Sequence, residues 1–164
     1  MWGLRRLPDL TFTVNWRHSA PSGSSVQMTA SHTGRAGRAL PWLFLLYAAA
    51  SFLHFAHNAE YLARYPNLPG SWSRADVYLA WCAVSGVGIL GYIIYLRGRR
   101  LIGLSFLALY ASLGLAGLLH YTRAPFGHHT TMMNATIWAE AAAAASLFVN
   151  VVVLAVRAHP QPHC

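Results

Sequence analysis

Residues 77–96 read VYLAWCAVSGVGILGYIIYL and residues 101–119 read LIGLSFLALYASLGLAGLL, with the basic link RGRR between them. Neither run contains a charged residue, and about 20 apolar residues are enough for a helix to cross the hydrocarbon core of a bilayer. Because the link is so short, the second helix must return antiparallel beside the first. The two runs therefore predict a transmembrane hairpin.

Two further apolar runs flank this hairpin. No fixed charge lies between Arg38 and Glu60, and the last run extends to Val156 with Glu140 as its only charge. We therefore expect an all-α fold, an integral membrane four-helix bundle over residues 40–157. The expected spans are residues 41–62, 76–96, 101–121 and 130–156.

The two ends of the chain lack such runs. Residues 1–39 have no sustained hydrophobic period, so we expect a disordered N-terminal tail on the cytoplasmic side. Met28 is an alternative start within this tail. The first helix is expected to begin near Pro41, because a first turn tolerates the missing amide donor of proline. Residues 158–164 are expected to form a short C-terminal tail.

The composition excludes several classes of protein. Hydrophobic residues make up 55% of the chain and charged residues 10%, which is unlike a soluble domain. The basic residues are all arginines that lie between apolar runs, so we expect a lipid bilayer and no nucleic acid as partner. Two cysteines, Cys82 and Cys164, cannot build a disulfide framework or a cysteine-based zinc motif. Arginine without lysine is typical of a GC-rich genome, and we expect a bacterial inner membrane.

The arginines also predict the orientation in the membrane, because short loops that carry them are poorly translocated. With four spans, both termini lie on the same side as the RGRR link. That side holds Arg35, Arg38, Arg97, Arg99, Arg100 and Arg157, against Arg64, Arg74 and Arg123 on the other. We therefore expect both termini in the cytoplasm.

The polar residues of the spans gather in the extracytoplasmic half of the predicted bundle. They are His54, His57, Asn58, Glu60, Asp76, His120, His128, His129, Asn134 and Glu140. Polar groups at membrane depth usually face the bundle interior and mark a function. Asp76 is the exception, because a carboxylate at the start of the second span is equally well explained as a helix cap.

Helical spacing indicates which of these groups share a face. His54 and His57 lie one turn apart, and so do His57 and Glu60. His129 and Glu140 fall on one stripe of the last span, with Glu140 about 15 Å deeper, near the middle of the bilayer. His54 is the partner that we expect for Glu140 at that depth.

Imidazoles and carboxylates that project into a helical bundle are typical ligands of zinc, copper or iron. We therefore expect a transition-metal site whose ligands are His54, His57, His120 and His129. Asn58, Asn134 and Trp138 are expected to contact the cofactor, and Glu140 or Glu60 to act as general base. Such a centre would support hydrolytic or redox chemistry at the outer leaflet. Methionines at 132 and 133 keep copper among the candidates.

Two alternatives use the same residues. In a haem-binding electron carrier, one histidine of the first span and His120 or His129 would be the axial ligands. In a metal-free protein that binds a small molecule or lipid and couples to protons, His54 and Glu140 would exchange a proton. Four spans are few for a transport path, so that alternative requires a homo-oligomer or a partner subunit in the membrane.

Overall fold

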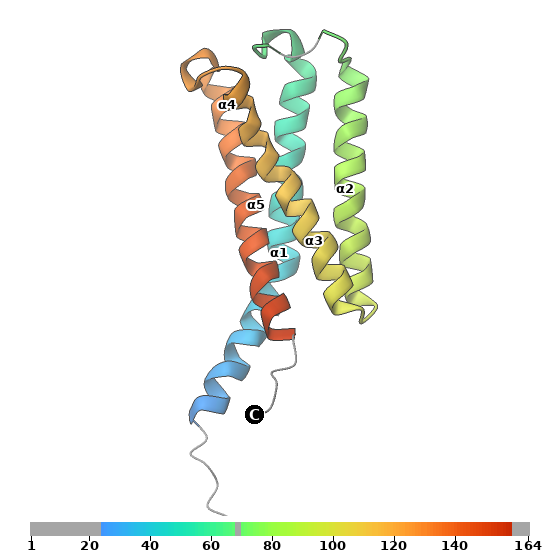
Figure 1. The fold of residues 1–164 in the computed structure, drawn as a ribbon, viewed down its shortest axis with the longest axis vertical. Coiled ribbons are helices and arrows are strands. Elements are labelled where there is room, and N and C mark those ends of the chain that lie inside the picture. Colours follow the sequence, from blue (N-terminus) through green and yellow to red (C-terminus); the bar gives the residue numbers. More distant parts are fainter. Residues whose placement is uncertain (1–23, 68–69, 159–164) are drawn as a thin grey trace, which may run out of the picture.

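The computed structural model describes residues 24–67 and 70–158, with side chains from residue 34 onward. In this part of the chain, four helical segments are long and apolar enough to cross a membrane, and they run side by side (Figure 1). They are α1 (Ser24–Glu60), α2 (Arg74–Leu96), α3 (Arg100–Leu115) with its continuation, and α5 (Thr131–Ala158). The expected all-α four-helix bundle of a multi-pass membrane protein is confirmed.

The third span is a composite of three segments. Helix α3 is followed by the 3₁₀ turn η2 (Ala116–Leu119) and the short helix α4 (His120–Arg123). Two more 3₁₀ turns, η1 (Leu62–Arg64) and η3 (Phe126–His128), lie in the connections after α1 and α4. We call the end of the bundle that carries both connections the loop end; the α2–α3 turn lies at the other end (Figure 1).

Helix α1 begins earlier than expected. It starts at Ser24, so Pro41 lies inside the helix rather than in its first turn, and residues 24–39 are helical. No proline interrupts residues 24–40, and adding residues to an existing helix costs far less than starting one. Pro41 has no amide hydrogen to donate to the carbonyl of Gly37, a loss that helices accommodate by bending. The expectations for residues 1–23 and 159–164 lie outside the described residues.

The helices form a closed ring of neighbours. Helix α1 packs against α5 and α2, while α3 packs against α2 and α5. Helix α2 approaches α3 closely at Gly91, where an added Cβ would stand 2.7 Å from Cβ of Phe106. A glycine at this position therefore allows the two backbones to come together, as small residues do in membrane helices.

The apolar core fills the bundle below the loop end. Tyr47 and Tyr110 are fully buried with their rings 4.4 Å apart, and the Tyr47 hydroxyl donates to the carbonyl of Tyr110 at 3.1 Å. Leu107 and Leu147 pack in the same cluster. The polar residues of the spans lie above this core, toward the loop end.

Helix α2 begins with a capping box. The Ser73 hydroxyl accepts from the Asp76 amide at 3.2 Å, and the Asp76 carboxylate accepts from the Ser73 amide at 2.8 Å. Each side chain thus satisfies an amide that the first turn of a helix leaves unpaired. Asp76 is therefore a helix cap, which is one of the two roles that its sequence position allowed.

Candidate functional site

Two buried side chains from the first and last spans meet inside the bundle. His54 on α1 and Glu140 on α5 place Nε2 and Oε2 3.6 Å apart, and each side chain is 2% exposed. Glu140 lies about 14 Å along α5 from its first residue, at 1.5 Å per residue. The partner that depth indicated for Glu140 therefore does lie beside it.

The contacts of His54 define its tautomer. The Asn58 amide nitrogen lies 3.1 Å from Nε2, so Nε2 is the acceptor and carries no hydrogen. Nδ1 then carries the hydrogen and donates to the hydroxyl of Thr136 at 3.4 Å, which in turn donates to the Met133 carbonyl. The single Nε2 lone pair of His54 is therefore engaged by Asn58, and Oε2 of Glu140 lies 3.6 Å from the same nitrogen.

Several buried polar atoms around His54 and Glu140 have no hydrogen-bond partner in the described part of the chain. Oε1 of Glu140, Oδ1 of Asn58 and the hydroxyl of Ser51 are buried and find no hydrogen-bond partner among the described residues. Nε2 of His54 already accepts from Asn58, and the Ser51 hydroxyl beside Glu140 is a single free donor, so two unpaired oxygens share one donor. Buried acceptors without donors cost free energy, and a cation removes that cost.

His120 supplies a second imidazole from the third span. Its ring centroid lies 5.4 Å from that of His54, and the ring planes are inclined by 74°. His120 follows directly on the 3₁₀ turn η2, and a 3₁₀ stretch within a helix is often found at functional positions. Gly117 in this turn faces the pair, because a Cβ there would stand 3.1 Å from Oε2 of Glu140.

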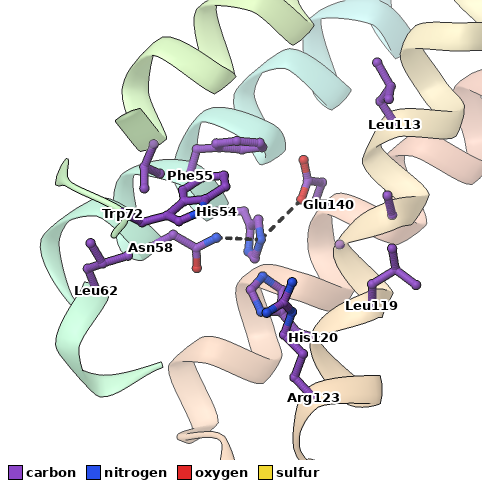
Figure 2. A pocket seen from close by; sticks show the side chains of 13 residues that line it. His54, Phe55, Asn58, Leu62, Trp72, Leu113, Leu119, His120, Arg123 and Glu140 are labelled. Carbon is purple, nitrogen blue, oxygen red and sulfur yellow. Dashed lines mark hydrogen bonds and ion pairs between the residues drawn. The ribbon is translucent and has the colours of Figure 1, made fainter. Parts of the chain in front are cut away.

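A cavity of about 270 Å³ opens beside these groups. Figure 2 shows His54, Asn58, His120 and Glu140 around it, with Arg123 next to His120. The remaining wall is apolar and includes Phe55, Leu62, Trp72, Val77, Leu113 and Leu119. The polar groups thus lie at a cavity with a mainly apolar wall, which is the usual character of a ligand site.

His129 lies next to His120 but outside the cavity. Their ring centroids are 6.3 Å apart, and Nδ1 of His129 donates to the Pro125 carbonyl at 3.2 Å. Its Nε2 is buried and has no partner in the described part of the chain. His129 does not line the cavity.

His57 belongs to a different cleft. It lines a second hollow at the loop end with Glu60, Arg64 and Met132, and its Nδ1 lies 2.8 Å from the hydroxyl of Tyr65. Tyr65 is 4% exposed, and burial raises the pKa of its phenol. The phenol therefore stays protonated and holds His57 away from the cavity.

Glu60 also lies outside the cavity. Its carboxylate is 2.7 Å from the guanidinium of Arg74 and accepts from the Tyr78 hydroxyl at 2.9 Å. Both partners belong to α2, so Glu60 links α1 to α2 at the surface of the loop end. These contacts engage the carboxylate in a structural role.

Asn134 and Trp138 are likewise away from the cavity. The Asn134 carbonyl accepts from the Tyr121 hydroxyl at 2.8 Å, and its amide donates to the carbonyls of Phe126 and His129 at 3.3 and 3.4 Å. Asn134 thus holds the connection before α5. Trp138 is 53% exposed, on the outside of the bundle.

Sequence reasoning missed four residues that shape the site: Tyr65, Gly117, Arg123 and Thr136. Thr136 falls on the stripe of His129 and Glu140, so helical spacing had already marked its face. The other three lie in or beside irregular turns, where no period predicts the direction of a side chain.

No three His, Cys, Asp or Glu side chains within residues 34–67 and 70–158 stand close enough together to form a metal-ligand set. Glu140 and the ring of His120 each lie beside His54, whereas His57 lines the second cleft. The chain matches no protein-family model, no curated protein sequence and no solved structure.

Proposed function

We propose that the protein binds one transition-metal ion between His54, His120 and Glu140, at the inner wall of the cavity. The observation that carries this proposal is the two buried oxygens without a partner in the described residues, Oε1 of Glu140 and Oδ1 of Asn58, beside the imidazole of His54, because a cation would satisfy them. The pair of His54 and Glu140 is the core of the site.

Two pairwise separations fit a shared ion, and the third ligand requires the His120 side chain to move. Two ligand atoms bound tetrahedrally at about 2.0 to 2.1 Å are about 3.3 Å apart, and Nε2 of His54 and Oε2 of Glu140 are 3.6 Å apart. Two imidazoles on one such ion have ring centroids about 5 Å apart, and those of His54 and His120 are 5.4 Å apart. Rotation of the His120 side chain at the edge of the cavity would complete the set.

The second hydrogen bond of His54 is also of the kind found at metal sites. Histidines that bind a metal through Nε2 usually donate from Nδ1 to an oxygen, which fixes the ring and its tautomer. His54 donates from Nδ1 to Thr136. Three protein ligands would leave a coordination position toward the cavity, as catalytic centres do, and we propose hydrolytic or redox chemistry there.

The donor set favours zinc or iron. Nitrogen and carboxylate ligands suit both ions, whereas reduced copper prefers thioethers. Met132 and Met133 line the second cleft rather than the cavity. A haem is a weaker candidate, because about 270 Å³ is below the range of about 300 to 1,000 Å³ typical of pockets for drug-sized ligands.

Elemental analysis of the purified protein in lipid nanodiscs tests this proposal. We expect about one zinc or iron per chain, because the ligand set is mononuclear. His54→Gln and Glu140→Gln should lose most of the metal, whereas His57→Gln, in the second cleft, should keep it. Thermal denaturation of the same samples shows that each variant is folded.

Three outcomes would overturn the metal proposal. The first is a folded protein that takes up neither zinc nor iron when both are supplied. The second is unchanged metal content in Glu140→Gln. The third is a Soret band in the optical spectrum, which would replace the metal ion by haem. A metal-free sample whose Glu140→Gln variant is still altered in function would favour the proton-exchange alternative.

A further inference from the structure

The cavity is sized for a short apolar chain. Its volume of about 270 Å³ equals roughly nine water-sized volumes of about 30 Å³. Phe55, Leu113 and Leu119 contribute to its wall from α1, α3 and η2. A two-chain lipid exceeds this space, whereas one chain of about eight carbons fits it.

One end of the cavity carries a cation. Arg123, the last residue of α4, lines the cavity and is exposed at the loop end. Its guanidinium contacts the Asn67 carbonyl at 3.4 Å, and Asn67 in turn donates to the Arg123 carbonyl at 2.7 Å. The backbone of Arg123 is thereby held in place, while most of its guanidinium hydrogens stay available.

The two other arginines at the loop end of the bundle already have partners. Arg74 pairs with Glu60 at 2.7 Å, and Arg64 lies over the ring of Tyr61 at 5.2 Å. No carboxylate lies within ion-pair distance of Arg123 in the described residues. A guanidinium with free donors favours a carboxylate or phosphate, which it binds through two parallel hydrogen bonds.

The other end of the cavity reaches the pair of His54 and Glu140. Gly117 leaves this end open, because a Cβ there would stand 3.1 Å from Oε2 of Glu140 and 3.9 Å from Nε2 of His54. A ligand whose polar head binds Arg123 would therefore extend its alkyl chain toward His54 and Glu140. Its apolar part would lie against the apolar side chains of the wall, where burial is favourable.

We infer that the cavity takes a single-chain amphiphile with an anionic head, bound by Arg123, with its chain directed toward His54 and Glu140. Binding follows from the cavity and Arg123 alone. That this ligand is the substrate rests on the metal site proposed above. The alkyl chain of the ligand, rather than its anionic head, would then lie next to the metal.

Calorimetric titration of the protein in phosphatidylcholine nanodiscs tests the inference, with empty nanodiscs as the blank. The probes are octanoate, with the expected charge and length, octylamine, with the opposite charge, and acetate, with no chain. We expect saturable binding of octanoate at one site per chain and no saturable binding of octylamine or acetate. Equal binding of octylamine would overturn the anionic head.

Two matched pairs of variants locate the site. Arg123→Gln should weaken octanoate binding by about tenfold or more, as the loss of a charged hydrogen bond does, and Arg64→Gln should leave it unchanged. Gly117→Ala should abolish binding by filling the inner end, whereas Gly127→Ala, whose Cβ would meet open space, should not. If Gly117→Ala fails to fold, Ala116→Leu obstructs the same wall.

Titration of metal-loaded and chelator-treated samples separates this inference from the metal proposal. Octanoate binding in protein without metal supports the cavity ligand even where the metal proposal fails. A metal-loaded protein that does not bind octanoate overturns the cavity ligand alone. Binding that both Arg123→Gln and Gly117→Ala leave unchanged would mean that octanoate only partitions into the lipid, and would overturn the inference.

Discussion

Glu60 and Glu140 are the two glutamates of the chain, and the bundle gives them opposite surroundings. Glu60 is exposed and engaged by Arg74 and Tyr78. Glu140 is 1% exposed, and one of its oxygens has no partner in the described residues. A carboxylate that already has partners gains little from a metal, whereas one without partners gains much. Of the two, Glu140 is therefore the glutamate that we propose as a metal ligand.

Glu60→Gln should leave the metal content unchanged. The free energy of unfolding should fall by less than about 1 kcal/mol, because exposed ion pairs contribute little. Elemental analysis and thermal denaturation of the variant and the parent measure both quantities. Loss of metal in Glu60→Gln would bring Glu60 into the site and contradict its structural role.

Two glycines of the bundle lie where atoms of another helix come close. In α2, Gly91 lets the backbone of α3 approach, and in η2, Gly117 keeps a methyl group off the pair of His54 and Glu140. Both positions are set by packing against another helix rather than by the backbone angles of the glycine. We therefore expect Gly91 to matter for the stability of the bundle and Gly117 for the space beside His54 and Glu140.

Gly91→Ala should lower the free energy of unfolding by about 1 to 3 kcal/mol, the usual cost of overpacking. The added methyl group would meet Cβ of Phe106 at 2.7 Å and the Leu107 amide nitrogen at 3.1 Å, and neither can move freely. Gly86→Ala on the same helix is the matched control, since its Cβ would meet nothing within 4 Å. Denaturation of both variants in mild detergent compares them, and an equal effect would argue against close packing at Gly91.

Inside the bundle, apolar and polar side chains gather at opposite ends. Tyr47, Tyr110 and Leu147 fill the interior on the side of the α2–α3 turn, and the histidines lie toward the loop end. From the distribution of arginines, we propose that the loop end is extracytoplasmic. The cavity and its ligand would then open at the outer leaflet.

Cysteine labelling in intact cells tests this orientation. With Cys82 and Cys164 replaced by serine, Ser71→Cys at the loop end should react with a maleimide that does not cross membranes. Arg99→Cys, in the α2–α3 turn, should react only after the membrane is permeabilised. Both positions are exposed, so the reversed pattern would place the termini outside.

Local properties of the sequence were enough for the spans, their number and the gathering of polar groups at one end. Apolar length and the placement of charges act within one helix at a time, so residues 76–96 and 130–156 were located to within about two residues of α2 and α5. The capping box of Asp76 is local as well. The start of α1 was not predicted, because it depends on how far a stable helix propagates through residues without strong preference.

Tertiary packing chose which polar residues meet. Periodicity put His54 and His57 on one face, yet only His54 reaches Glu140, because Tyr65 from the connection holds His57 in another cleft. Periodicity likewise put His129 with Glu140, but His129 precedes α5 and has an extended backbone, so the helical period does not reach it, and His120 lies beside His54 instead. The rotation of each helix about its own axis is set by its neighbours, and no single helix carries that information in its sequence.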